Sequence, residues 1–464
     1  MRLHLALTCV VCLTATTCAP SSSTFGSRGF DSSVSIYDPN PAHLWNRLHS
    51  AFFVREDLPS TRLVPDALDP PLWFDTQYLL AKPSHQHAVR ALDDFLRTHA
   101  ENLIHDPLKR AILQRDLWAV FDWSVVRPSR QGSNEHAYDK EKRELQVRLA
   151  KVMRQVALTP EEIRSLPNNY DQAVASGEFA TKYDPAQPDR AFLPPDLFDP
   201  HGPWVELEGP GDPEPVARQH FSQFSGRSSF LIFVRFPEGR KAAFDYLQTL
   251  WNFPKPTIPS RNFAPGEDIA PNPDLPQFPQ GTQFALVRQM TLFDNQSKLV
   301  NTAITESVQI RVYNAVGGED GPLVGPFNYD DLAAKSGQRF CEIALSRPQF
   351  FNHKAGGLRS TGRDEKQYFV FGFAGPDHGL PANYSSLDAS TPALKECVVC
   401  HSKKGINSVN SRSHLLRPHQ LQVDRPHDAD GRVWWQDART LPWKQGQDDW
   451  GLLSQDWKAS AATR

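Results

Sequence analysis

The sequence predicts an α+β fold: a helical N-terminal domain, then an antiparallel β-rich domain that ends in a further C-terminal helix. One change in the pattern of apolar residues and a proline-rich stretch between the two patterns lead to this prediction. Between residues 37 and 182 apolar side chains recur near the helical period, whereas from about residue 217 they alternate with a period of two. A proline-rich stretch, residues 183–216, separates the two patterns and is expected to be a linker without regular structure.

Proline and cap residues mark the helix starts in the first domain. Asn40-Pro41 precedes the segment 43–53, and Asp106-Pro107 precedes 108–121. Thr159 and Glu162 have the spacing of a capping box. Two further helices are predicted from apolar spacing at 87–103 and 140–157.

Alternating segments predict the sheet of the second domain, residues 217–390. They lie at 229–236, 283–293, 299–313, 339–345 and 367–374. The turn-forming run from Asp294 to Ser297 predicts a hairpin between two of them. A second proline-rich connection occupies 254–280.

The N-terminus has the pattern of an export signal. Arg2 precedes a short apolar run and then small polar residues, so residues 1–19 are expected to be a signal peptide and 20–36 a disordered leader. Cys18 is a candidate lipid anchor, with soluble export as the alternative. A periplasmic or cell-surface location follows, and no later segment is apolar and long enough to span a membrane.

Charge is almost balanced along the chain. The 50 basic and 53 acidic side chains give a formal charge of −3, so no electrostatic signal for nucleic acid is present. A chain of 464 residues with 39% hydrophobic residues can build more than one core. Partners therefore have to be inferred from individual sites.

The segment 391–464 contains the most specific motif, Cys397-Val-Val-Cys400-His401. Thr391-Pro392 in front of it predicts a helix start, with Ser390 or Thr391 as the cap. On a helix the two thiols would lie on one face with the imidazole beside them, so that two thioether bonds and an iron ligand can reach one haem.

This motif resembles the attachment site of c-type cytochromes. The resemblance implies one covalent haem c, with Cys397 and Cys400 as thioether anchors and His401 as the proximal iron ligand. The alternatives are a redox-active cysteine pair, a structural disulfide, and a zinc site completed by His414 and His419.

The sixth iron ligand is open at this level. No methionine follows Met290, so the chain differs from the ordinary class I cytochrome c, in which a downstream methionine completes the coordination. His414 and His419 are the leading candidates, and the position can also lack a protein ligand. Further candidates are Met290, His353, His378, His427, Lys403 and Lys404.

The order of elements, a sheet followed by the motif, is similar to that of the β-sheet cytochromes c-prime, which implies a five-coordinate iron. Three functions follow as expectations: electron transfer with a redox partner protein, an enzyme or gas sensor with an open iron position, and a partner-binding protein with a structural haem. In the tail, five tryptophans after residue 433 are expected to pack against the sheet, and Cys341 is expected to be a buried thiol.

Overall fold

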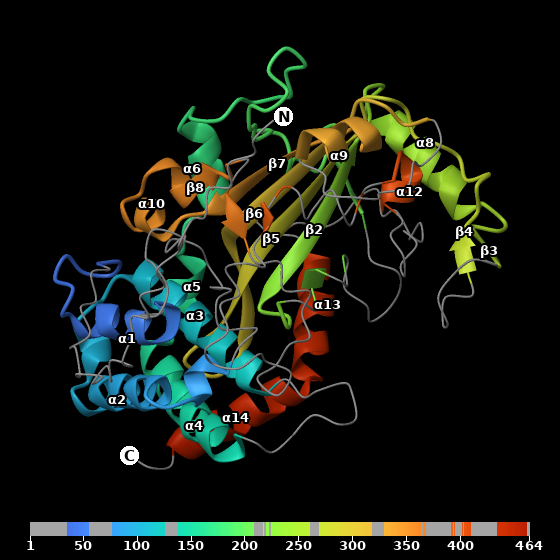
Figure 1. Cartoon of the computed structure of the whole chain (residues 1–464). Coiled ribbons are helices and arrows are strands. Elements are labelled where there is room, and N and C mark those ends of the chain that lie inside the picture. Colours follow the sequence, from blue (N-terminus) through green and yellow to red (C-terminus); the bar gives the residue numbers. More distant parts are fainter. Residues whose placement is uncertain are drawn as a thin grey trace, which may run out of the picture.

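The α+β prediction is confirmed by the computed structural model, in which helices precede and flank an antiparallel sheet (Figure 1). The structure describes residues 35–54, 77–125, 138–207, 217, 220–221, 224–259, 269–317, 329–362, 365–367, 391–392, 394, 401, 403–409 and 434–461. The predicted signal peptide and most of the leader lie outside these residues. So do Cys18, Cys397, Cys400, His378, His414, His419 and His427.

The helical part begins at Leu44, where His43 and not the predicted Asn40 is the cap residue, whereas the caps predicted for two later helices are present. Its helices are α1 (Leu44–Phe53), α2 (Ser84–Arg97), α3 (Pro107–Val125), α4 (Asp139–Val156), α5 (Pro160–Arg164) and α6 (Asn169–Ala175), with short 3-10 turns at Tyr78–Leu80 and Ala100–Asn102. The Asp106 side chain accepts the Leu108 N–H at 2.9 Å. The capping box is present too, because Thr159 and Glu162 each bond the backbone of the other.

One six-stranded sheet has the order β1-β2-β5-β6-β7-β8, with every neighbour antiparallel. Its strands are β1 (Val205–Leu207), β2 (Ser228–Arg235), β5 (Gln283–Phe293), β6 (Leu299–Tyr313), β7 (Gln338–Leu345) and β8 (Leu358–Ser360). The predicted hairpin joins β5 and β6, with Asp294 N–H donating to the Lys298 carbonyl at 2.9 Å. The predicted strand 367–374 lies almost wholly outside the described residues.

Several smaller elements surround the sheet. They are α8 (Arg240–Trp251), α9 (Tyr329–Ser336), α10 (Arg347–Phe351), a 3-10 turn at Ala355–Gly357 and α12 (Ile406–Val409), with two short ribbons formed by β3 (Thr257–Pro259) with β4 (Ile269–Pro271) and β9 (Lys366–Gln367) with β10 (Thr391–Pro392). The C-terminal helices are α13 (Trp434–Gln445) and α14 (Asp448–Ala461).

Two expectations about local structure are wrong. The stretch 183–216 contains strand β1, because the proline-free run Trp204–Leu207 pairs with β2 and forms the edge of the sheet. Thr391 and Pro392 do not start a helix: they form β10, whose pairing with β9 gives the backbone a different set of partners. Leu394 is helical, and residues 395–400 lie outside the described part.

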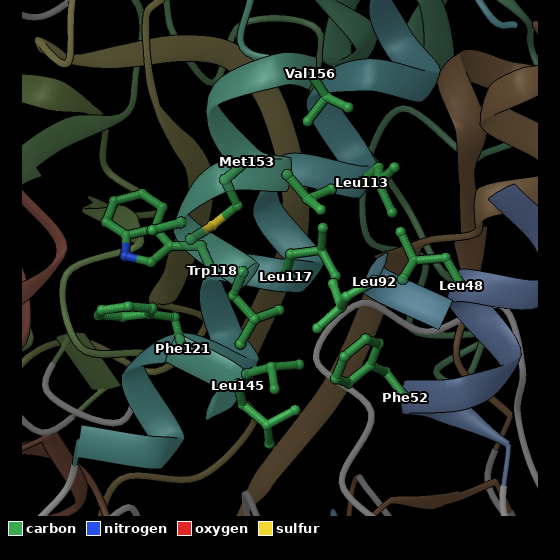
Figure 2. Packing of buried hydrophobic residues seen from close by; sticks show 14 of the residues in the cluster. Leu48, Phe52, Leu92, Leu113, Leu117, Trp118, Phe121, Leu145, Met153 and Val156 are labelled. Atoms are coloured by element: carbon green, nitrogen blue, oxygen red, sulfur yellow. The ribbon is translucent and has the colours of Figure 1, made fainter. Parts of the chain in front are cut away.

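Helix α3 is buried on nearly all sides, between the other helices and the sheet. Figure 2 shows Leu113, Leu117 and Trp118 of this helix packed against side chains of its neighbours. Its polar residues reach outward into buried ion pairs. Arg115 meets Glu306 of β6 at 3.0 Å, and Asp122 meets Lys444 of α13 at 3.0 Å. The helical part, the sheet and the C-terminal helices thus share one interior.

The tryptophans of the tail pack as predicted where the structure describes them. Trp450 and Trp457 of α14 lie edge-on to Phe293 of β5, with ring centroids 6.1 and 4.9 Å away. Trp443 of α13 meets Phe221 at 4.6 Å. No helix within the described residues has both the length and the hydropathy of a membrane span.

Candidate functional site

His401 lies beside the end of the sheet formed by β6 and β7. The side-chain amide of Gln338, the first residue of β7, donates to the carbonyl oxygens of His401 and Lys403 at 2.8 and 2.9 Å. Gln338 is buried, so this is a fixed attachment point for the segment that follows the CVVCH motif.

Gly405 lets the same segment turn back into α12. Its φ is +52°, a left-handed conformation that favours glycine, and a Cβ atom there would lie 2.3 Å from the Gln277 side chain. Gln277 in turn accepts the Ile406 N–H at 2.7 Å. Ser408 completes the turn by a 2.7 Å hydrogen bond between its hydroxyl and that of Tyr313 on β6.

The turn determines which nitrogen of His401 carries the proton. Nδ1 lies 2.7 Å from the Ser408 carbonyl oxygen. A carbonyl can only accept, so Nδ1 carries the hydrogen and Nε2 of the neutral ring keeps its lone pair. Backbone carbonyls orient metal-binding histidines in the same way. Nε2 is therefore the acceptor nitrogen of the His401 ring.

Arg311 of β6 lies next to that nitrogen. Its Nη2 approaches Nε2 of His401 to 3.3 Å, and its guanidinium lies over the Phe340 ring, 5.6 Å from the centroid. Within the described part of the chain, no carboxylate forms an ion pair with Arg311, and its buried Nη1 has no hydrogen-bond partner there. An unneutralised buried guanidinium suits an anionic group that would bind at this place.

A second histidine, His220, faces His401. The two rings are parallel within 4°, and their centroids are 6.3 Å apart. His220 also lies 6.0 Å from the Phe230 ring on β2. Close by, the Arg288 guanidinium covers the ring of Phe224 at 4.2 Å. The site thus joins two imidazoles, two arginines and several phenylalanines on neighbouring strands and loops.

Both imidazoles are neutral at pH 7. Burial lowers the pKa of His220 to about 4, and Arg311 and Arg288 add to the decrease. Burial is also the largest cause of the lowered pKa of His401, and Arg311 again contributes. Neutral imidazole is the form that binds metal ions.

Met290 and His353, two ligand candidates from the sequence, lie elsewhere. Met290 is fully buried in the core cluster between the sheet and α6, and His353 is exposed in the turn after α10. Lys403 is exposed. Of the predicted site residues, the structure therefore brings His401 into the site and leaves these three outside it.

No sequence pattern pointed to His220, Arg311 or Gln338 as site residues. His220 stands in "ARQHFSQFSG" without a motif, and its approach to His401 results from the fold alone. Arg311 sits in an alternating strand as one polar residue among several. The hydrogen bonds from Gln338 to the motif segment could be predicted only if the strand order and register were already known.

Cys341 of β7 is a free thiol that is partly buried. Burial raises its pKa to about 11, which makes it a poor nucleophile at neutral pH. No cluster of three or more His, Cys, Asp or Glu side chains able to hold a metal ion occurs among the described residues. Comparison with protein families, with curated proteins and with solved structures finds no match to this chain.

Proposed function

We propose that the chain is an exported monohaem c-type protein that transfers electrons, with His401 as the proximal iron ligand. The observation that carries the proposal is the orientation of His401: its Nδ1–H is held by the Ser408 carbonyl, which leaves the Nε2 lone pair for a metal ion. His401 is the last residue of the CVVCH motif, whose Cys397 and Cys400 would form the thioether bonds.

The side chains around His401 fit a flat apolar group that carries carboxylates. Phe230 and Phe340 supply aromatic surface, and Arg311 supplies a buried cation without a described carboxylate partner. Such a cation stabilises an anion and shifts a redox equilibrium toward the form with more negative charge. Phenylalanine side chains cannot bind a zinc ion, whereas they suit contact with an apolar ring system.

When bound, haem c supplies an iron atom that exchanges one electron between its ferric and ferrous states. The protein's part is to hold the iron ligand, exclude water and adjust the potential. Gln338 and Ser408 fix the backbone and ring of His401, so that little reorganisation accompanies a change of iron charge. A small reorganisation and a filled iron coordination sphere favour electron transfer over a reaction of substrate at an open sixth coordination position.

The direct test is the absorption spectrum of the alkaline pyridine complex of protein purified after export. One haem per chain that remains attached during denaturation is expected. Cys397→Ser or Cys400→Ser should remove one thioether and shift the spectrum toward that of a single-vinyl haem. Cys341→Ser is the matched control, because that thiol lies in β7 outside the motif. Protein without haem, or with stoichiometric zinc, would refute the proposal.

Export can be tested separately from haem binding. Deletion of residues 1–19 should keep the protein in the cytoplasm and abolish attachment, and an unrelated secretion signal in their place should restore it. Full covalent haem in the protein without any signal would contradict the proposed location.

A further inference from the structure

We propose that His220 is the second axial ligand, binding the iron from the side opposite His401. The inference rests on the proposed haem function and makes it more specific, because a site with two histidine ligands is a closed electron-transfer site. The assignment of His220 excludes His414 and His419 as iron ligands. It also excludes an open sixth coordination position on the iron.

The ring geometry carries the assignment. Two imidazoles on opposite sides of one metal ion, each bound by a metal–nitrogen bond of about 2 Å, have centroids about 6 Å apart. The rings of His220 and His401 are 6.3 Å apart and parallel within 4°. Offset stacked aromatic rings also have centroids about 4.5–7 Å apart, and the spin state of the bound iron distinguishes the two arrangements.

His220 is held in place through the next residue, Phe221. Phe221 is fully buried against Trp443, and its N–H donates to the Ala217 carbonyl at 2.9 Å. Beyond it, the Gly226 N–H donates to the Phe221 carbonyl at 3.3 Å before β2 begins. A turn anchored in this way presents its histidine with little freedom, as a ligand site requires.

Arg311 and the metal ion would use the same lone pair. Its Nη2 lies 3.3 Å from Nε2 of His401, so this contact has to break when the iron binds. A long arginine side chain can make that move, and its guanidinium remains beside the site to pair with a carboxylate of the ligand. Arg311 is thus a positioning residue that holds Nε2 before metal binding.

The test is His220→Ala in the exported haem protein, with Met290→Leu and His353→Ala as controls. The ferric wild type is expected to be low-spin, with the electron paramagnetic resonance of two imidazole ligands. His220→Ala should keep one covalent haem per chain, become high-spin, and bind carbon monoxide in the ferrous state, which the wild type should not do. Added imidazole should restore the low-spin signal. The controls should match the wild type.

His220→Met covers the case in which the alanine variant does not fold. It should remain low-spin with a higher midpoint potential, because thioether ligands favour ferrous iron. A His220→Ala protein that keeps the spectrum of two imidazole ligands would overturn the assignment, particularly if His414→Ala or His419→Ala lost it instead. Wild-type protein without covalent haem would overturn the proposed function itself, so the two failures are distinguishable.

Discussion

The side-chain amide of Gln338 joins the first residue of β7 to the backbone of His401, with 2.8 Å between the amide nitrogen and the carbonyl oxygen. The same nitrogen reaches the Lys403 carbonyl at 2.9 Å. The sheet therefore holds the motif segment through one buried residue, and that residue is open to a direct test.

Gln338→Leu should lower the free energy of unfolding by about 2 kcal/mol, because two carbonyl groups lose their donor. Gln338→Glu should be at least as harmful, since a carboxylate of the same shape cannot donate. Urea unfolding measures both, with exposed Gln172→Leu on α6 as the control. Equal stability of the Gln338→Leu and Gln172→Leu proteins would show that the attachment contributes nothing.

Gly405→Ala should disturb the turn that holds the ring of His401. The added Cβ would be 2.3 Å from the Gln277 side chain, in a conformation with φ of +52°. Gly177→Ala is a matched control, because Gly177 has φ of +72° and open space around its Cβ position. The control should cost about 1 kcal/mol of left-handed strain, and Gly405→Ala clearly more. The same pair should differ in haem content per chain.

His49→Phe should reduce the loss of stability in acid. His49 is buried between Tyr37 and Phe53, and burial, followed by the Arg347 charge, holds its pKa well below the usual value. Below about pH 6.5 the unfolded chain then binds a proton that the folded chain refuses, so acidification favours unfolding.

This histidine can contribute up to about 1.4 kcal/mol per pH unit, and that contribution is absent in His49→Phe. Unfolding free energies measured from pH 7 down to pH 5 should therefore fall less steeply in the variant. His353→Phe, at an exposed position, controls for the change of residue type. Parallel curves for wild type and His49→Phe would disprove this origin of acid sensitivity.

Trp457→Ala should cost about 3–5 kcal/mol, because it leaves a cavity against Phe293 in a shared core. Leu103→Ala is the control, since 52% of Leu103 is exposed, and it should change stability by less than about 0.5 kcal/mol. If both variants unfolded at the same urea concentration, α14 would have to be peripheral.

Local patterns predicted most of the regular structure. The strands at 283–293 and 299–313 were predicted with the bounds that the structure has, since their alternation and the intervening turn are local features. Helix starts at Pro107 and Pro160 followed from cap chemistry. The helix start predicted at Thr391-Pro392 is wrong because these residues pair with a distant strand, Lys366–Gln367, in spite of their cap-like sequence.

Only part of the site could be predicted. His401 was found from five consecutive residues, and its motif cysteines remain a prediction because they lie outside the described residues. His220 and Arg311 could not be found, because their meeting with His401 depends on the order of strands and on two loops. Tertiary neighbours of this kind leave no periodicity in the sequence.

The two parallel imidazoles have a consequence for how folding can be observed. His220 precedes β2 and His401 follows β10, so the chain that joins the two rings contains most of the sheet. Contacts of such long sequence separation form late in folding. A spectroscopic signal that requires both rings would therefore report the completion of the whole β-rich part, and its appearance after dilution from denaturant would time the last step of assembly.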